Sequence, residues 1–128
     1  MKCNKKAWSF IHYNYKTSNI VALWVFIRYD SIMNDNKMIN ILSELAHKNR
    51  FEIYKLLIRK GDNGLTIGEI SKLLAIPLST LSFHLNGLKD ADLITQKKIV
   101  RNVYCYAQID LLTDVLEKLR SECCSEEN

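Results

Sequence analysis

The sequence lacks a long apolar run, a glycine-rich phosphate loop and a recognisable catalytic set. Its longest apolar run extends only from Ile20 to Ile27, which is far short of the roughly 20 residues that a membrane-spanning helix needs. The carboxylates are scattered, and no histidine, cysteine and acid combination suggests nucleophilic catalysis. We therefore expect a protein that neither crosses a membrane nor acts as an enzyme.

The sequence also lacks the evenly spaced cysteines of a secreted disulfide framework. Its four cysteines are Cys3, Cys105 and the adjacent pair Cys123 and Cys124. An adjacent pair suits a reducing compartment, where thiols act as ligands or redox centres. This cysteine usage predicts a cytoplasmic protein.

Positive charge is concentrated at the start of the chain. Residues 1–32 have five basic side chains and one aspartate, which equals the +4 of the whole chain, so the remaining residues are neutral on balance. A neutral body has no broad basic face for a polyanion such as DNA. Binding to DNA would depend on local basic positions and on contact through a dimer.

Residues 1–32 differ in composition from the rest and show neither a helical nor a strand period. Three interpretations are open: an amphipathic arm, a secretory signal, or upstream residues of a chain whose translation starts at Met33 or Met38. The composition break favours the third, and no small-residue cleavage site follows Ile27. We therefore divide the chain into an extension over 1–32, one domain over 33–124 and a polar tail over 125–128, and expect the extension to be dispensable for DNA binding.

Three helical patterns lie between Lys37 and Pro77. Apolar stripes indicate a helix from about Lys37 and a second over Lys48 to Lys60, which Gly61 ends. Thr66 and Glu69 have the spacing of a capping box and predict the start of a third, which stops before Pro77. The stripes are expected to bury these residues: Met38, Ile41, Leu42, Leu45, Phe51, Tyr54, Leu57, Ile58, Ile67, Ile70, Leu73 and Leu74.

A short fourth helix follows Pro77 and carries small polar side chains on one face. Four leucines (Leu78, Leu81, Leu85 and Leu88) gather on its other face at 100° per residue. Small hydroxyls and amides suit base edges and phosphates in a major groove. The residues predicted to contact DNA from this helix are Ser79, Thr80, Ser82, Phe83, His84 and Asn86.

Two strands and a last helix complete the pattern. Leu93 to Lys98 and Asn102 to Gln108 alternate as strands around a basic turn, where Lys97, Lys98 and Arg101 are predicted to hold phosphates. The helix from Asp110 onward has an apolar stripe that needs a cover. This order predicts a mainly α protein with a two-stranded β wing, a winged helix-turn-helix that binds double-stranded DNA, and a partner subunit is the simplest cover for the last helix.

The segments ILSELAHKNRFEIYKLLIRKG and IPLSTLSFHLNGLKDADLI resemble the bacterial arsenical-resistance-repressor (ArsR/SmtB) family of winged-helix regulators. The first resembles the opening of the family domain, and the second resembles its recognition helix and the entry to its wing. The resemblance extends over about Met38 to Cys124. It implies a repressor that forms a homodimer through its first and last helices, binds double-stranded operator DNA and leaves this operator when an ion or oxidant binds. Family members often have a histidine where Phe83 stands and a glycine at the wing tip, which this sequence lacks.

The metal sites known from the family are largely missing from this sequence. Thr66 to Glu69 occupy the place of its cysteine-x-cysteine motif. Its zinc site on the last helix needs histidines beside aspartates such as Asp110 and Asp114, and none is present there. The resemblance therefore does not support sensing of zinc or nickel.

Cys123 and Cys124 remain as the predicted inducer site. Two neighbouring thiolates provide most of a site for trivalent arsenic or antimony. The third ligand is Cys105, a cysteine of the other subunit, or absent, and the last case would suit methylarsenite. Alternatively, Cys123 is a small buried hydrophobe that continues the apolar stripe, and Cys105 belongs to the core. We expect no obligatory cofactor.

Two other functions fit the same pattern less well. A thiol-based redox repressor would use these cysteines, although adjacent cysteines form a strained ring, so oxidation would more readily link subunits or use Cys105. A dimerisation module that does not bind DNA would have no need for the basic wing.

Overall fold

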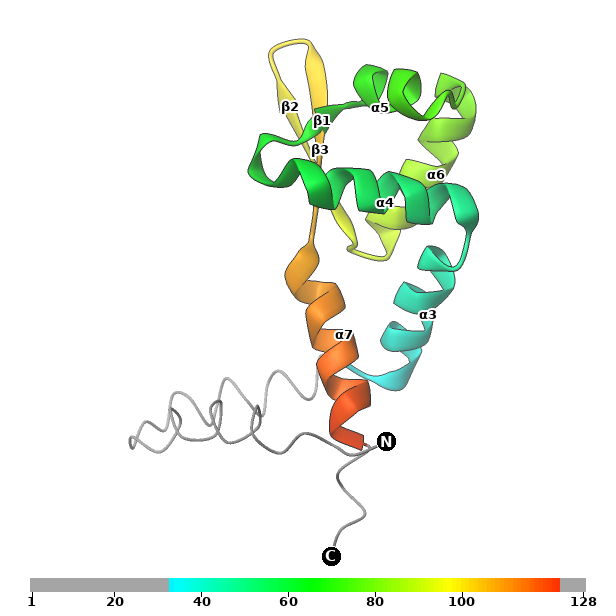
Figure 1. Cartoon of the computed structure of the whole chain (residues 1–128), viewed down its shortest axis with the longest axis vertical. Helices are drawn as coiled ribbons and strands as arrows, with labels where there is room; N and C mark the ends of the chain where they lie inside the picture. Colours follow the sequence, from blue (N-terminus) through cyan, green and yellow to red (C-terminus); the bar gives the residue numbers. More distant parts are fainter. Residues whose placement is uncertain (1–32, 123–128) are drawn as a thin grey trace, which may run out of the picture. The chain divides into compact units, whose positions relative to one another are not determined.

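The computed structural model describes residues 33–122, and the chain divides into two compact units. One unit is Asp35–Val115, and the described residues of the other are Met33, Asn34 and Leu116–Glu122. Figure 1 shows helices and one small sheet in the larger unit. Residues 1–32 and 123–128, including Cys123 and Cys124, lie outside the described residues.

The first two described helices are α3 (Asp35–Leu45) and α4 (Lys48–Lys60). The backbone N–H of Asn49 donates to Nδ1 of His47 at 3.3 Å, so the imidazole caps the start of α4. Gly61 ends α4 with a φ of 57°, a conformation that suits glycine. The bounds of α4 are those predicted from the sequence.

The helix-turn-helix consists of α5 (Ile67–Leu74) and α6 (Leu78–Asp90). The predicted capping box is present: Glu69 N–H donates to Thr66 Oγ1, and Thr66 N–H donates to the Glu69 carboxylate. In the turn, Ser71 Oγ donates to the carbonyl of Ile76 at 2.7 Å, and Ile76 N–H donates to the carbonyl of Ser71. These two bonds tie the end of α5 to the entry of α6.

The sheet has three antiparallel strands in the order β1-β3-β2, and therefore one more strand than the sequence predicted. β2 (Ile94–Ile99) and β3 (Asn102–Ala107) form the wing, and β1 (Leu65–Thr66) pairs with the middle of β3 at Tyr104 and Cys105. A strand of two residues has no measurable alternation, which is why sequence periodicity missed it. β1 thus joins the start of the helix-turn-helix to the middle of the second wing strand.

The core lies between the helices and the base of the sheet, but the apolar stripes are less completely buried than predicted. Ile53, Tyr54 and Leu57 of α4 are fully buried, as are Ile41, Ile70, Leu81, Leu85, Leu88, Leu93 and Ile94. By contrast, Leu42, Phe51, Leu73 and Leu78 are exposed. Phe51 lies in the first turn of α4, Leu73 in the last turn of α5 and Leu78 at the start of α6.

α7 (Ile109–Glu122) buries Val115, whereas Leu116 and Leu119 remain exposed. In the smaller unit, Lys118 Nζ donates to the carbonyl of Met33 at 2.7 Å. Within residues 33–122, no helix is long and apolar enough to cross a membrane.

Candidate nucleic-acid interface

The outer face of α6 carries four small polar side chains that are all exposed: Ser79, Thr80, Ser82 and Asn86. Ser82 Oγ donates to the carbonyl of Leu78 at 2.9 Å, so its hydroxyl remains free mainly as an acceptor. The other three side chains have both donor and acceptor capacity to offer. The structure thus brings these predicted residues together on one side of the helix.

Phe83 lies on the same face and is 65% exposed. Its ring contacts His84 edge-on, with 5.6 Å between the centroids, and the guanidinium carbon of Arg50 lies 5.7 Å from its centroid. These contacts fix the orientation of an aromatic ring that is otherwise in solvent. An exposed, oriented apolar ring among small polar groups suits an apolar group on a ligand.

His84 was predicted among the DNA contacts, and the structure contradicts this prediction. Only 4% of the residue is exposed. His84 lies three residues after Leu81 and four before Leu88, so helical geometry turns it toward the core with those leucines. It belongs to the support of α6 and not to its outer face.

His84 instead takes part in a buried polar contact between α6 and the start of α4. The amide nitrogen of Asn49 lies 3.2 Å from Nε2 of His84, and Nδ1 of the same ring is buried without a hydrogen-bond partner. The rings of His47 and His84 lie 4.7 Å apart. Burial, and then the nearby His47 and Arg50, lower the pKa of His84.

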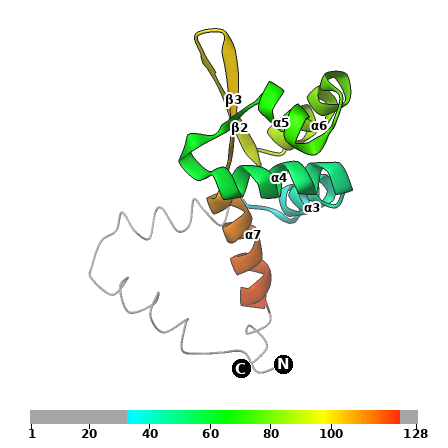
Figure 2. The same ribbon diagram turned by 45° about the horizontal axis from the view of Figure 1, so that its top comes forward.

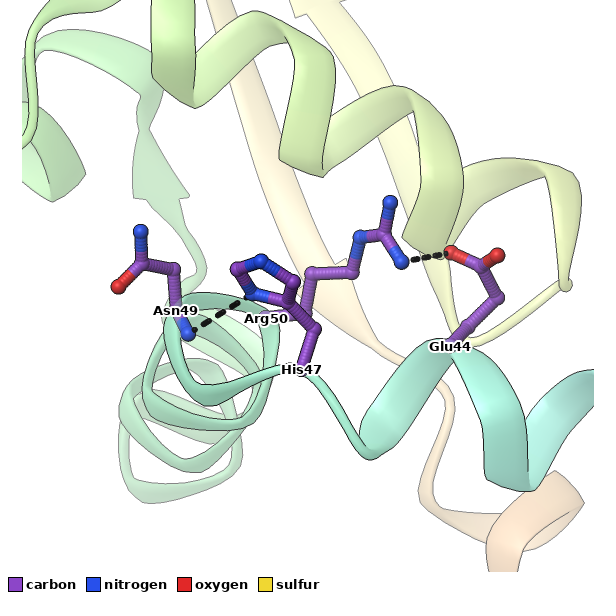
Figure 3. Close-up of polar contacts among 4 residues, drawn as sticks. All are labelled: Glu44, His47, Asn49 and Arg50. Atoms are coloured by element: carbon purple, nitrogen blue, oxygen red, sulfur yellow. Dashed lines mark hydrogen bonds and ion pairs between the residues drawn. The ribbon is translucent and has the colours of Figure 1, made fainter.

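An ion pair beneath α6 was missed by the sequence reasoning. Arg50 Nη1 of α4 lies 2.7 Å from Glu44 Oε2 of α3, as Figure 3 shows. Gly87 of α6 lies against this pair, since a Cβ there would be 2.5 Å from Glu44 Oε2 and 3.0 Å from the Arg50 guanidinium. A glycine inside a helix was the available signal, because it often marks a close packing contact.

The wing carries the three predicted cations, and all of them are exposed: Lys97, Lys98 and Arg101. Lys97 Nζ lies 5.4 Å from the centre of the Tyr106 ring on the neighbouring strand. Lys97 and Lys98 point to opposite faces of the hairpin because side chains alternate along a strand. The wing therefore presents positive charge on both faces and at its turn.

Cys105 was a possible third ligand for arsenic, and its surroundings argue against that role. The side chain is fully buried on β3, and Gln96 Nε2 lies 3.7 Å from its Sγ. Burial raises the pKa of the thiol, an effect that the Gln96 hydrogen bond only partly opposes. A buried, protonated thiol is a core residue, and no cluster of three or more metal-binding side chains occurs in the part of the chain that the structure describes.

The comparisons with known proteins agree with this geometry. A helix-turn-helix domain model matches residues 45–97. An ArsR-like transcriptional regulator from Rhodococcus sp. RHA1 has a TM-score of 0.63 and 19% identity, covering 70% of this chain and 81% of its own. The chain has the winged helix-turn-helix fold of ArsR-family regulators.

Two further structures extend this comparison. The transcriptional regulator HlyU from Vibrio vulnificus CMCP6 is 27% identical with a TM-score of 0.53, over 70% of this chain and 94% of its own. A protein described as a possible transcriptional regulator for arsenical resistance is 23% identical with a TM-score of 0.56, over 64% and 82%. No curated protein matches the chain. The resemblance to the ArsR/SmtB family is thereby confirmed, and the matched proteins are regulators and not enzymes, as expected from the sequence.

Proposed function

We propose that this ArsR-like protein is a dimeric transcriptional repressor that binds operator DNA. The observation that carries the proposal is that one compact unit combines an outer helix face of exposed small polar groups with a projecting hairpin that carries exposed cations. Small polar groups can hydrogen-bond to base edges in the major groove, and cations can bind phosphates. Residues 33–128 have no net charge even with these three cations counted, so the local cations of the wing are the main source of electrostatic affinity.

In this proposal the exposed side chains of α6 read the major groove. Ser79, Thr80, Ser82 and Asn86 contact base edges or nearby phosphates, and Phe83 contacts a thymine methyl group or a sugar. Lys97, Lys98 and Arg101 hold phosphates. His84, being buried, only supports the position of α6.

Selection of duplexes from a random pool, followed by anisotropy titrations at several salt concentrations, tests these roles. Arg101→Ala is expected to weaken binding to all duplexes and to reduce the salt slope by about one unit. Asn86→Ala is expected to change sequence preference and to cost ~1–3 kcal/mol on the selected duplex only. If the wing change alters preference at an unchanged salt slope, the two roles are reversed; if the protein selects no duplex, it is not a DNA-binding repressor.

The homodimer belongs to the same proposal. Apolar side chains are exposed on the first and last helices of the domain: Ile39 on α3, and Leu116 and Leu119 on α7. A second copy of the chain would cover these side chains. Leu116→Ser is expected to shift the protein toward monomer in sedimentation velocity. Leu73→Ser changes a leucine on α5 of similar exposure, and this matched control should leave the dimer intact. Equal behaviour of the two variants would contradict dimerisation through α7.

The inducer in this proposal is trivalent arsenic, antimony or methylarsenite bound by Cys123 and Cys124. The support is chemical, because two adjacent thiolates suit a soft trivalent ion. Since Cys105 is buried in the core, the third ligand would be a cysteine of the other subunit, or the site would have only two thiolates. Binding near the dimer-forming helix α7 would rotate the α6 helix of one subunit relative to that of the other. Because half-sites lie about 34 Å apart, a small rotation misaligns both helices with their grooves.

Release of DNA by arsenite, methylarsenite, zinc and peroxide distinguishes the possible signals. A protein with both Cys123→Ser and Cys124→Ser should bind DNA normally and stay bound when arsenicals are added. If the double variant still releases DNA at the arsenical concentration that releases the unchanged protein, the cysteine pair is not the site. Release by peroxide alone would indicate a redox repressor instead.

A further inference from the structure

The tip of the wing is apolar although its flanks are basic. Ile99 ends β2 and Val100 begins the two-residue turn, and they are 48% and 86% exposed. Lys98 and Arg101 stand directly beside them in the sequence and are also exposed. Figures 1 and 2 both show the hairpin projecting beyond the helices of its unit, so the most remote part of the wing presents two β-branched apolar side chains to solvent.

The backbone of Val100 makes this arrangement costly for the free protein. Val100 has a φ of 57°, a conformation that disfavours β-branched residues and that glycine or asparagine adopts readily in two-residue hairpins. Its side chain gains almost no burial in return. Strained residues of this kind commonly occur at functional positions. Because this valine does not stabilise the free protein, we expect its side chain to contact a binding partner.

We propose that Ile99 and Val100 form an apolar wedge that enters the minor groove of the operator and partly unstacks one base-pair step. This inference rests on the proposed DNA-binding function and deepens it. The minor groove is about 6 Å wide, which admits the tip of a hairpin but not a helix. Inserted apolar side chains separate base steps and kink the duplex toward the major groove.

The exposed cations beside the apolar tip favour DNA as its binding partner. Lys98 and Arg101 flank the wedge and are placed to hold the phosphates on either side of the groove, while Lys97 follows along β2. Two apolar residues form too small a patch for a stable protein interface. The same compact unit also carries α6, so the helix and the wedge can engage one duplex together.

The wedge also predicts sequence preference at a step that α6 does not touch. Pyrimidine–purine steps such as TA and CA unstack most readily. The operator is therefore expected to carry such a step where the wing meets the minor groove, and replacing it by a GC step should weaken binding to the unchanged protein.

The experiment uses full-length protein and the duplex selected from the random pool. DNA bending is measured by energy transfer between end labels, and unstacking by the fluorescence of 2-aminopurine placed at the step. The test variants are Val100→Asn, which suits the turn but removes the apolar group, and Ile99→Ser. Arg101→Ala is the matched control, since it removes a neighbouring charge and leaves both wedge residues.

The unchanged protein is expected to bend the duplex and to raise 2-aminopurine fluorescence. Val100→Asn and Ile99→Ser should lose most of both signals, bind roughly 3–10-fold more weakly and lose the preference for TA over GC, at an unchanged salt slope. Arg101→Ala should reduce the salt slope and keep the 2-aminopurine signal. If both wedge variants bend and unstack the duplex as the unchanged protein does, the wedge is refuted while DNA binding stands; if no duplex is selected, both proposals fail.

Discussion

Arg50 Nη1 lies 2.7 Å from Glu44 Oε2, and the side chains are only 14% and 23% exposed. The pair links α3 to α4 and lies against Gly87 of α6, while the same guanidinium carbon lies 5.7 Å from the centroid of the exposed ring of Phe83. One ion pair thus connects three helices and reaches the outer face of the candidate reading helix.

Glu44→Gln is expected to lower the free energy of unfolding by about 1–3 kcal/mol, because it leaves the largely buried Arg50 guanidinium without its charged partner. Urea denaturation measures the loss. Glu52→Gln is the matched control: Glu52 pairs with Lys55 at 3.2 Å on an exposed surface, where the loss should stay below about 0.5 kcal/mol. Equal losses would show that the Glu44–Arg50 pair contributes no more than a surface pair.

The buried His84 predicts a loss of stability in mildly acidic solution. Its folded-state pKa is lowered, chiefly by burial, so well above about pH 6.5 the ring is neutral in both states and has no effect on stability. As the pH falls below that value the unfolded state takes up the proton first, and stability decreases until the folded pKa is reached. Protonation would also leave a charged ring whose buried Nδ1 has no hydrogen-bond partner.

Urea denaturation of the unchanged protein and of His84→Gln, between about pH 7.5 and about pH 5, checks this prediction. The unchanged protein should lose stability over the acidic part of the range, and His84→Gln should show a distinctly flatter dependence. Parallel curves would mean that His84 is protonated as easily in the folded protein as in the unfolded chain.

Gly64→Ala is expected to lower the free energy of unfolding by about 2–4 kcal/mol. Gly64 has a φ of 61°, and a Cβ would lie 2.6 Å from the Tyr106 ring and 2.9 Å from the carbonyl oxygen of Cys105, which as backbone cannot move aside. Gly68→Ala serves as the control, because nothing lies within 4 Å of a Cβ there and the first turn of α5 should gain up to about 1 kcal/mol. A tolerated alanine at position 64 would show that β1 can leave the sheet without unfolding the domain.

Cys105 is expected to resist thiol reagents in the folded protein. Burial shields the side chain and raises its pKa, so both access and the thiolate fraction are reduced. A variant with serine at positions 3, 123 and 124 isolates this thiol, which should react at least about 100-fold more slowly in buffer than in denaturant. Rapid labelling in buffer would restore Cys105 as a candidate arsenic ligand.

The sequence by itself determined the local structure of this protein. The bounds of α4, the capping box of Thr66 and Glu69 and the two strands of the wing follow from interactions within a few residues of one another, which is the range over which periodicity and capping act. The resemblance in the segments around α4 and α6 also gave the fold, which the solved structures confirm. The assignment of DNA contacts and of arsenic ligands stays a prediction.

Tertiary structure alone decided which groups face solvent at the edge of each stripe. His84 has a place on the helical wheel beside both the polar face and the leucines, and the packing of α4 against α6 made it a core residue. The Glu44–Arg50 pair spans two helices, and β1 exists only because β3 pairs with it. Periodicity orients a side chain around its own helix or strand, whereas burial, pairing and a lowered pKa depend on neighbours that only the folded chain brings close.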